Sequence, residues 1–209
     1  MNKTILSLGL ILCLSFSQVV YANTALPKVK AKGAVLIEQD SGRVLYEQNA
    51  YAPLPMASTT KIMTCILTLE KGKLDDIVVT SKRASVAPPV KLKLKVGEQQ
   101  RLGDLLYALM LQSDNDVAVA IAEHIGGSVE GFCEMMTEKA KEIGAQHTSF
   151  KTPNGLDAEG HYASAYDMAL IGAYALKNPE FVKIITTTTI TIPTMPTQKS
   201  ERHDLQNKN

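Results

Sequence analysis

Short runs of β-branched and aliphatic residues predict three strands in this chain. Residues 33–39 and 43–48 flank the turn sequence Asp40-Ser41-Gly42, an arrangement typical of a β-hairpin. Residues 186–192 consist of Thr and Ile only, which favours a third strand. Because an isolated two-stranded hairpin is marginally stable, the first two strands need other elements to complete their sheet.

Helical periodicity predicts about six helices beside these strands. Apolar residues recur at i, i+3, i+4 and i+7, as they do on the buried face of an amphipathic helix. Ser or Asn precedes several of these segments and Gly follows several, and these are the preferred helix caps. The expected helices cover residues 58–70, 102–110, 115–125, 128–143, 164–176 and a short last segment from 178.

Two parts of the chain carry weaker patterns. In residues 74–97 short β-like runs, including the alternation over 90–96, are broken by Pro88-Pro89, so small-sheet or irregular structure is expected. After Pro193 the sequence turns polar and loses periodicity, and no regular element is expected. Together the elements favour an α/β (α+β) fold in which an antiparallel sheet is flanked by helices.

The first 22 residues have the features of a secretory signal peptide. Lys3 gives a positive start, and the apolar stretch 5–16 is too short to span a membrane. Val20-Tyr21-Ala22 places small residues where signal peptidase reads them. The sequence therefore predicts an exported protein whose mature chain starts near Asn23, outside the cytoplasmic membrane. An uncleaved N-terminal anchor is the alternative.

The composition is that of an ordinary globular protein. Of 209 residues, 45% are hydrophobic and 21% charged, and the formal net charge is +1. This balance gives no electrostatic case for binding nucleic acid, which needs a concentrated basic face. Besides Cys13 in the signal segment there are Cys65 and Cys133, each on an apolar stretch of a predicted helix. Two separate buried thiols are expected, although export would permit a disulfide.

The first candidate for chemistry is the sequence Ser-Thr-Thr-Lys at 58–61, which follows a Pro-rich turn and opens a predicted helix. Residues i and i+3 share a helix face, so the Ser58 hydroxyl and the Lys61 amine can meet. A serine needs a base to act as a nucleophile, and a desolvated lysine with a lowered pKa can be that base. Alone, the same pattern also fits a simple helix cap followed by a solvated charge.

The second candidate is Ser113-Asp114-Asn115, which lies between two predicted helices. All three residue types are ordinary helix caps, which is the simpler interpretation of the motif alone. In a functional interpretation Ser113 relays a proton between Lys61 and a leaving group, and Asn115 binds the substrate's peptide carbonyl. The two motifs in this order are far more specific than either one, because Ser-x-x-Lys, Ser-Asp-Asn and Lys-Thr-Gly form one catalytic set.

At this point the chain resembles the low-molecular-weight penicillin-binding proteins, the serine-type D-alanyl-D-alanine carboxypeptidases. The resemblance covers roughly residues 30–209. The stretches that carry it are residues 34–37, 55–64, 105–116, 152–157 and 160–167.

The resemblance implies a β-lactamase/transpeptidase-like fold and a catalytic domain over residues 23–209. It implies that Ser58 forms an acyl-enzyme, that Lys61 accepts its proton, and that Ser113 and Asn115 complete the site. The implied substrate is the D-Ala-D-Ala end of a peptidoglycan stem peptide in the bacterial cell wall, and the implied inhibitors are β-lactams. No cofactor or metal is needed for this chemistry.

The chain departs from the family in its last motif. A Lys-Thr-Gly or Lys-Ser-Gly sequence should follow soon after a stretch like 205–209, where the chain stops, and Lys199-Ser200-Glu201 imitates it only weakly. We therefore expect an incomplete catalytic domain that lacks its C-terminal strands, the family's C-terminal β-domain and its membrane anchor. Such a chain would lack a cation for the substrate carboxylate and one oxyanion donor. Loss of one oxyanion donor typically lowers the rate about 100- to 1,000-fold.

Three other functions stay open. A β-lactamase would need a glutamate base, and Glu159 is the only acid near the right region, with no asparagine close behind it. A non-catalytic or vestigial binding protein would use the same surface without acylation. A metal hydrolase is poorly supported, because His124, His147, His161 and His203 are scattered and have no ligand spacing; a structural role is expected for His161.

Overall fold

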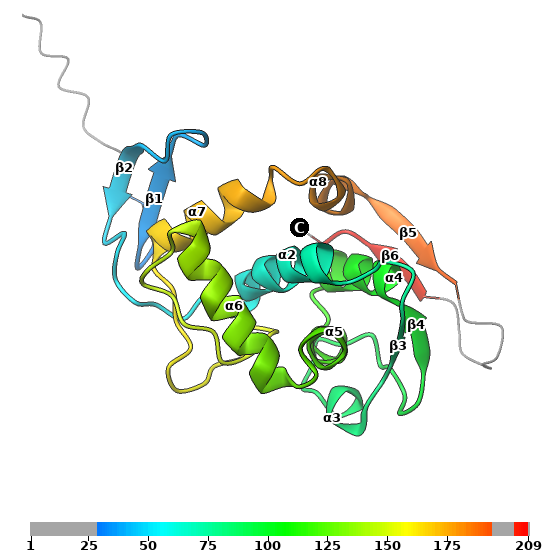
Figure 1. Ribbon diagram of the computed structural model, residues 1–209. Helices are drawn as coiled ribbons and strands as arrows, with labels where there is room; N and C mark the ends of the chain where they lie inside the picture. Colours follow the sequence, from blue (N-terminus) through cyan, green and yellow to red (C-terminus); the bar gives the residue numbers. More distant parts are fainter. Residues whose placement is uncertain (1–28, 194–202, 209) are drawn as a thin grey trace, which may run out of the picture. The chain divides into compact units, whose positions relative to one another are not determined.

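The computed structural model describes residues 29–193 and 203–208. Its contacts divide the chain into two units, residues 1–30 and 31–209. Of the first unit only Val29 and Lys30 are described, so the predicted signal peptide and Cys13 lie outside the described residues. The second unit carries the described helices and strands (Figure 1).

A central helix, α2 (Lys61–Lys71), organises this second unit. It packs against α5 (Asn115–Gly126), α6 (Val129–Ile143), α7 (Ala165–Ala175) and α8 (Pro179–Thr186), which surround it in Figure 1. Because α2 is enclosed in this way, seven of its 11 residues are buried. A helix that is buried on most of its faces belongs to the core, and its first residue, Lys61, enters the core with it.

Side-chain caps fix where the surrounding helices begin, as the sequence predicted. The Ser128 hydroxyl accepts a hydrogen bond from the Gly131 N–H at the start of α6, and Ser164 accepts one from the Asp167 N–H at the start of α7. Asn178 caps α8 through the N–H groups of its first turn. A short helix, α3 (Lys82–Ser85), is capped in the same way by its preceding serine.

The helix predicted at 102–110 changes its geometry part-way. It begins as α4 (Leu102–Tyr107) and continues as a π-helical segment, η2 (Ala108–Gln112). The segment ends at Ser113, whose backbone lies in the left-handed region with φ 63°. Single-turn π-helical segments are rare and often occur at functional sites.

The strands form three separate antiparallel pairs within the described residues. The predicted hairpin is confirmed as β1 (Ala34–Ile37) with β2 (Val44–Gln48). The second pair joins β3 (Ile77–Val79) to β4 (Gln99–Arg101). The expected single sheet flanked by helices is therefore present here as three two-stranded pieces, while the mixture of helices and antiparallel strands is as predicted.

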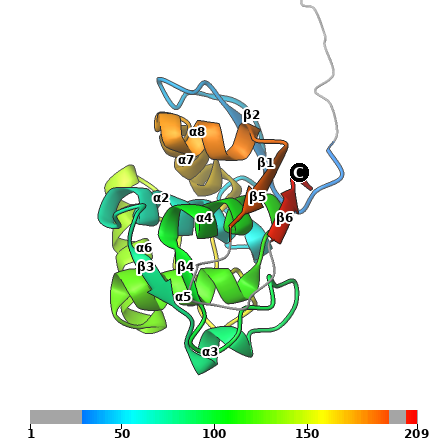
Figure 2. The same cartoon turned by 90° about the vertical axis from the view of Figure 1, so that its right-hand side faces the viewer.

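The third pair corrects an expectation, because a strand occurs after Pro193. β5 (Thr189–Ile192) pairs with β6 (His203–Gln206), and Ile190 faces Leu205 across the pair. β6 was missed because Leu205 is its only aliphatic residue, so its conformation comes from backbone pairing rather than from its own pattern. Figure 2 shows the pair beside α4, and β6 packs on η2.

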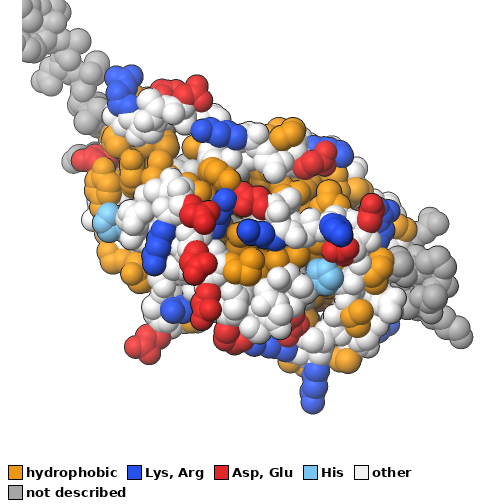
Figure 3. Space-filling model, viewed as in Figure 1, with side chains coloured by type: hydrophobic (Ala, Val, Ile, Leu, Met, Phe, Trp, Pro, Cys, Tyr) orange, Lys and Arg blue, Asp and Glu red, His pale blue; other side chains and the backbone are white. Residues whose placement is uncertain are grey.

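The described surface is mixed in charge. In Figure 3 lysine and arginine side chains alternate with aspartate and glutamate across the visible face, without a field of one sign. Within residues 29–193 and 203–208, none of the helices has the length and apolar character that a membrane crossing requires.

Candidate active site

The Ser-x-x-Lys sequence forms a tight turn that leads into the central helix. Residues Ala57–Thr60 form a 3₁₀ turn, η1, and the α-helix begins only at Lys61, three residues later than the sequence suggested. Ala57 has a φ of 47°, in the left-handed region that residues with a Cβ rarely adopt. The turn leaves Ser58 exposed while Lys61 is only 2% exposed, and the Lys61 Nζ lies 3.2 Å from the Ser58 Oγ.

Three oxygen atoms surround the Lys61 amine. Besides Ser58, its Nζ lies 2.9 Å from the Asn115 Oδ1 and 2.8 Å from the backbone carbonyl of Asn154. Both of these oxygens can only accept, so they take two N–H bonds of the amine. A neutral amine then keeps one lone pair for the Ser58 O–H, which is the arrangement that a general base requires.

Burial favours that neutral form. Desolvation lowers the pKa of Lys61 to about 8, and the nearby Asp114 carboxylate opposes this shift. About one amine in ten is therefore unprotonated at pH 7, a far larger share than for an exposed lysine.

The Ser-Asp-Asn sequence brings only part of its expected set into contact with this pair. Asn115 reaches Lys61 directly, from the first turn of α5. Ser113 is half-buried at the end of η2, and its hydroxyl makes no hydrogen bond to any residue in the described part of the chain. The structure thus joins Ser58, Lys61 and Asn115, and places Ser113 two residues away along the chain.

A loop over this motif, residues 88–94, is held by Asn115 and Asp116. The Asn115 Nδ2 donates to the carbonyls of Pro88 and Pro89. The buried Asp116 carboxylate accepts hydrogen bonds from the backbone N–H groups of Leu92, Lys93 and Leu94. These bonds hold residues 90–96 as a loop, so the β-like alternation there does not become a strand. This role of Asp116 was not predicted from the sequence.

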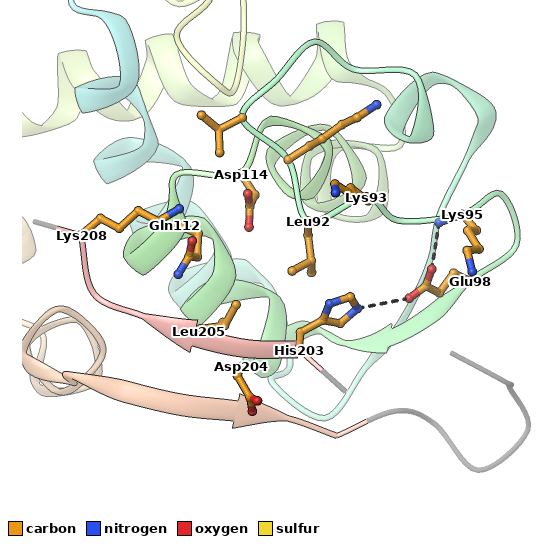
Figure 4. Close-up of a pocket in the computed structure, with 12 residues that line it drawn as sticks. Leu92, Lys93, Lys95, Glu98, Gln112, Asp114, His203, Asp204, Leu205 and Lys208 are labelled. Carbon is orange, nitrogen blue, oxygen red and sulfur yellow. Dashed lines mark hydrogen bonds and ion pairs between the residues drawn. The ribbon is translucent and has the colours of Figure 1, made fainter. Parts of the chain in front are cut away.

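Asp114 borders a cavity of about 430 Å³ next to the cluster. Figure 4 shows its side chain and that of Leu92 directed into the cavity, opposite His203 and Leu205 of β6. The Asp114 Oδ2 is buried without a hydrogen-bond partner among the residues described. Burial, and then the Asp116 charge, raise the pKa of Asp114 to about 7, against the opposing effect of Lys208 and Lys61.

A second loop, residues 150–161, packs against the turn and the start of α2. Besides the Asn154 carbonyl on Lys61, the Pro153 carbonyl accepts a hydrogen bond of 2.6 Å from the Thr64 hydroxyl. Gly155, with φ +86°, packs so closely that a Cβ there would lie 1.8 Å from the Ala57 carbonyl oxygen. The Asn-Gly turn at 154–155 was the available sequence signal for this contact.

None of the remaining candidates contacts Ser58, Lys61 or Asn115 directly among the residues described, although His161 bonds to Thr60 on the same turn. Glu159, the possible β-lactamase base, is exposed. His124 lies near Asp76, His147 near Asp167 and His203 near Glu98, while His161 bonds to backbone and threonine. Cys65 and Cys133 are free and buried, as predicted, and Lys199-Ser200-Glu201 lies outside the described residues.

The chain is similar to a described protein family and to several named proteins. Residues 20–209 match the family described as D-alanyl-D-alanine carboxypeptidase. The D-alanyl-D-alanine carboxypeptidase DacF of Bacillus subtilis is 45% identical over 159 residues, which are 74% of this chain and 41% of DacF. DacC of Escherichia coli is 40% identical over 157 residues, covering 70% of this chain and 39% of its own. The chain thus spans about two fifths of the length of these relatives.

Solved structures show the same likeness in three dimensions. A D-alanyl-D-alanine carboxypeptidase from Mycobacterium tuberculosis superposes with a TM-score of 0.82 at 27% identity, over 90% of this chain and 70% of that one. Penicillin binding protein 6B from Escherichia coli gives a TM-score of 0.76 at 30% identity, over 88% and 60% of the two chains.

Proposed function

The chain belongs to the D-alanyl-D-alanine carboxypeptidase family and shares its fold, and from this we propose that it serves as a serine peptidase acting through an acyl-enzyme on Ser58. Its substrate is the D-Ala-D-Ala end of a peptidoglycan stem peptide. The observation that carries the proposal is the position of the buried Lys61 amine. Its Nζ contacts the Asn115 Oδ1 and the Asn154 carbonyl oxygen, and it also lies within hydrogen-bond distance of the Ser58 Oγ.

The reaction follows from that arrangement. The Lys61 amine takes the Ser58 proton while the Ser58 Oγ attacks the carbonyl carbon of the penultimate D-alanine. The oxyanion that forms is stabilised by the Ser58 backbone N–H at the start of the turn. As the peptide bond breaks, the proton passes from Lys61 to the departing D-alanine amine. Water, deprotonated by Lys61, then hydrolyses the ester and restores the Ser58 hydroxyl.

Ser113 and Asn115 take the supporting roles in this proposal. Ser113 relays the proton to the leaving amine, for which its unbonded hydroxyl turns toward Lys61. Asn115 orients Lys61 through Oδ1 and binds the substrate carbonyl through Nδ2. For this second role the Asn115 amide has to release one of its two proline carbonyls.

The wider setting belongs to the same proposal. Residues 1–22 direct export and are removed, and residues 23–209 contribute the catalytic domain on the outer side of the cytoplasmic membrane. Trimming of stem peptides places the chain in peptidoglycan biosynthesis and in the control of cell shape. β-Lactams act on it because they resemble the D-Ala-D-Ala end and acylate the same serine.

Intact mass spectrometry after incubation with benzylpenicillin tests the proposal, beside a Ser58→Ala control. We expect one penicilloyl adduct on the wild type and none on Ser58→Ala. Folded wild-type protein without an adduct would show that this chain is a non-catalytic binding protein. Rapid hydrolysis of penicillin without accumulation of the adduct would favour a β-lactamase instead.

Release of D-alanine then tests the substrate. Incubation with diacetyl-L-Lys-D-Ala-D-Ala should yield free D-alanine, and Lys61→Met should suppress both this release and the penicilloyl adduct. An adduct without D-alanine release would leave penicillin binding as the function and refute the carboxypeptidase step.

A further inference from the structure

A buried histidine bridges the two segments that hold the reactive pair. We infer that His161 is a positioning residue for Ser58 and Lys61: its neutral ring ties the turn that carries them to the loop that supports them. The inference rests on the proposed function, because it assigns His161 a part in the acylation of Ser58. It gives His161 a role beyond stabilising its own loop.

The hydrogen bonds of the ring define its state. The Nδ1 atom accepts from the backbone N–H of Lys151 at 3.0 Å, and the Nε2 atom lies 3.1 Å from the Thr60 Oγ1. Because a backbone N–H can only donate, Nδ1 carries no proton. The neutral ring therefore has its proton on Nε2 and donates it to the Thr60 hydroxyl. His161 is 6% exposed, and its ring packs edge-on against Phe150, so this state is enclosed by protein.

The bridge acts at a sensitive position. Thr60 is fully buried and lies between Ser58 and Lys61 on the same turn. The loop at the other end of the bridge supplies the Asn154 carbonyl to Lys61 and packs Gly155 on the backbone before Ser58. His161 thus fixes the spacing between the turn and the loop from which Lys61 takes one of its partners. A shift of about 1 Å in such a pair can reduce a rate by about 100-fold.

Protonation would break the bridge. A charged imidazole has N–H on both nitrogens, so Nδ1 would point a donor at the Lys151 N–H donor. The charged group that acts on the ring is Asp157 on the same loop. The charged residues at its two contacts are Lys151, which bonds through its backbone N–H, and Lys61, which follows Thr60 in the sequence. Burial lowers the pKa of His161, and Asp157 opposes this shift only in part. The neutral bridge is therefore kept at neutral pH and is lost in acid.

Variants separate the two hydrogen bonds. Asparagine at 161 can still accept from Lys151 but cannot reach Thr60, whereas glutamine places an amide N–H near the position of Nε2. We expect His161→Asn to slow penicillin acylation of Ser58 about tenfold, and His161→Gln to restore most of the rate. Thr60→Val should match His161→Asn, and the double variant should be no slower than either. His147→Asn is the matched control, because the His147 side chain is 58% exposed.

The pH profile and a titration of Lys61 complete the test. Below the ordinary histidine pKa the wild-type acylation rate should fall more steeply than the titration of Lys61 alone would give, and His161→Gln should lack this additional fall. By NMR, His161→Asn should move the Lys61 pKa up from about 8 as its support loosens. Variants that lose stability yet acylate at the wild-type rate, with Lys61 unshifted, would overturn the inference. If the wild type is never acylated, the proposed function fails. NMR measurement of the His161 tautomer and of the Lys61 pKa would still show whether His161 forms the bridge between the turn and the loop.

Discussion

Replacement of Gly155 by alanine would test the contact between the supporting loop and the reactive turn. Gly155 has a φ of +86°, and a Cβ on it would meet the Ala57 carbonyl oxygen at 1.8 Å and the Ser58 nitrogen at 3.0 Å. These neighbours are backbone atoms, so they can give way only if the turn itself moves. Gly160 in the same loop has a similar φ of +76°, but a Cβ there would meet only the flexible Lys151 side chain, at 3.4 Å.

Comparison of Gly155 with Gly160 separates the cost of a left-handed backbone conformation from the cost of the steric overlap at Gly155. Alanine in the left-handed region costs about 1 kcal/mol at either position. At 155 the new Cβ falls roughly 1.7 Å short of an ordinary contact of about 3.5 Å, and relief of such overpacking costs about 2 kcal/mol more. We therefore expect Gly155→Ala to lower the free energy of unfolding by about 3 kcal/mol and Gly160→Ala by about 1 kcal/mol.

The acylation rates of the two variants should differ even more than their stabilities. Because the overlap pushes the turn that carries Ser58, acylation by penicillin should slow about 100-fold in Gly155→Ala and little in Gly160→Ala. Urea denaturation gives the stabilities, and stopped-flow acylation at a temperature where circular dichroism shows both variants folded gives the rates. Equal losses of stability and equal rates in the two variants would refute this account of the turn.

Three further predictions follow from single contacts. The acylation rate should rise about tenfold per pH unit up to about pH 8, as Lys61 loses its proton, and level off above it; a flat profile would contradict Lys61 as the base. Asp116→Asn should cost about 3 kcal/mol and expose loop 88–94 to trypsin, because its carboxylate receives the backbone N–H groups of that loop; unchanged proteolysis would count against the clamp. Glu70→Gln should cost about 1 kcal/mol in urea denaturation, since Glu70 binds Lys139 at 2.9 Å and the Tyr174 hydroxyl at 2.6 Å; a double-mutant cycle with Lys139→Met should show coupling.

Local patterns predicted the elements whose signals lie in their own sequence. Ser128, Ser164 and Asn178 cap the helices they precede, and Asp40-Ser41-Gly42 closes the first hairpin. The encounter of Ser58 with Lys61 followed from their spacing, although the chain forms it through a 3₁₀ turn.

The parts that escaped prediction depend on contacts between distant segments. The Asn154 carbonyl reaches Lys61 across 93 residues, and a backbone carbonyl leaves no mark in the sequence. β6 exists because β5 pairs with it, and residues 90–96 stay a loop because Asp116 takes their N–H groups. The π-helical geometry before Ser113 is likewise set by packing, since its residues would suit an ordinary α-helix.

The two buried thiols, Cys65 and Cys133, allow transient local unfolding of this protein to be measured by alkylation. Burial raises the pKa of Cys65 to about 12 and that of Cys133 to about 11. At pH 8 only roughly one Cys65 in ten thousand is a thiolate, the form that reacts. Labelling therefore proceeds through transient openings of α2 and α6, the helices on which these thiols lie. In a chain without Cys13, the ratio of the two labelling rates shows whether these helices open together or one before the other.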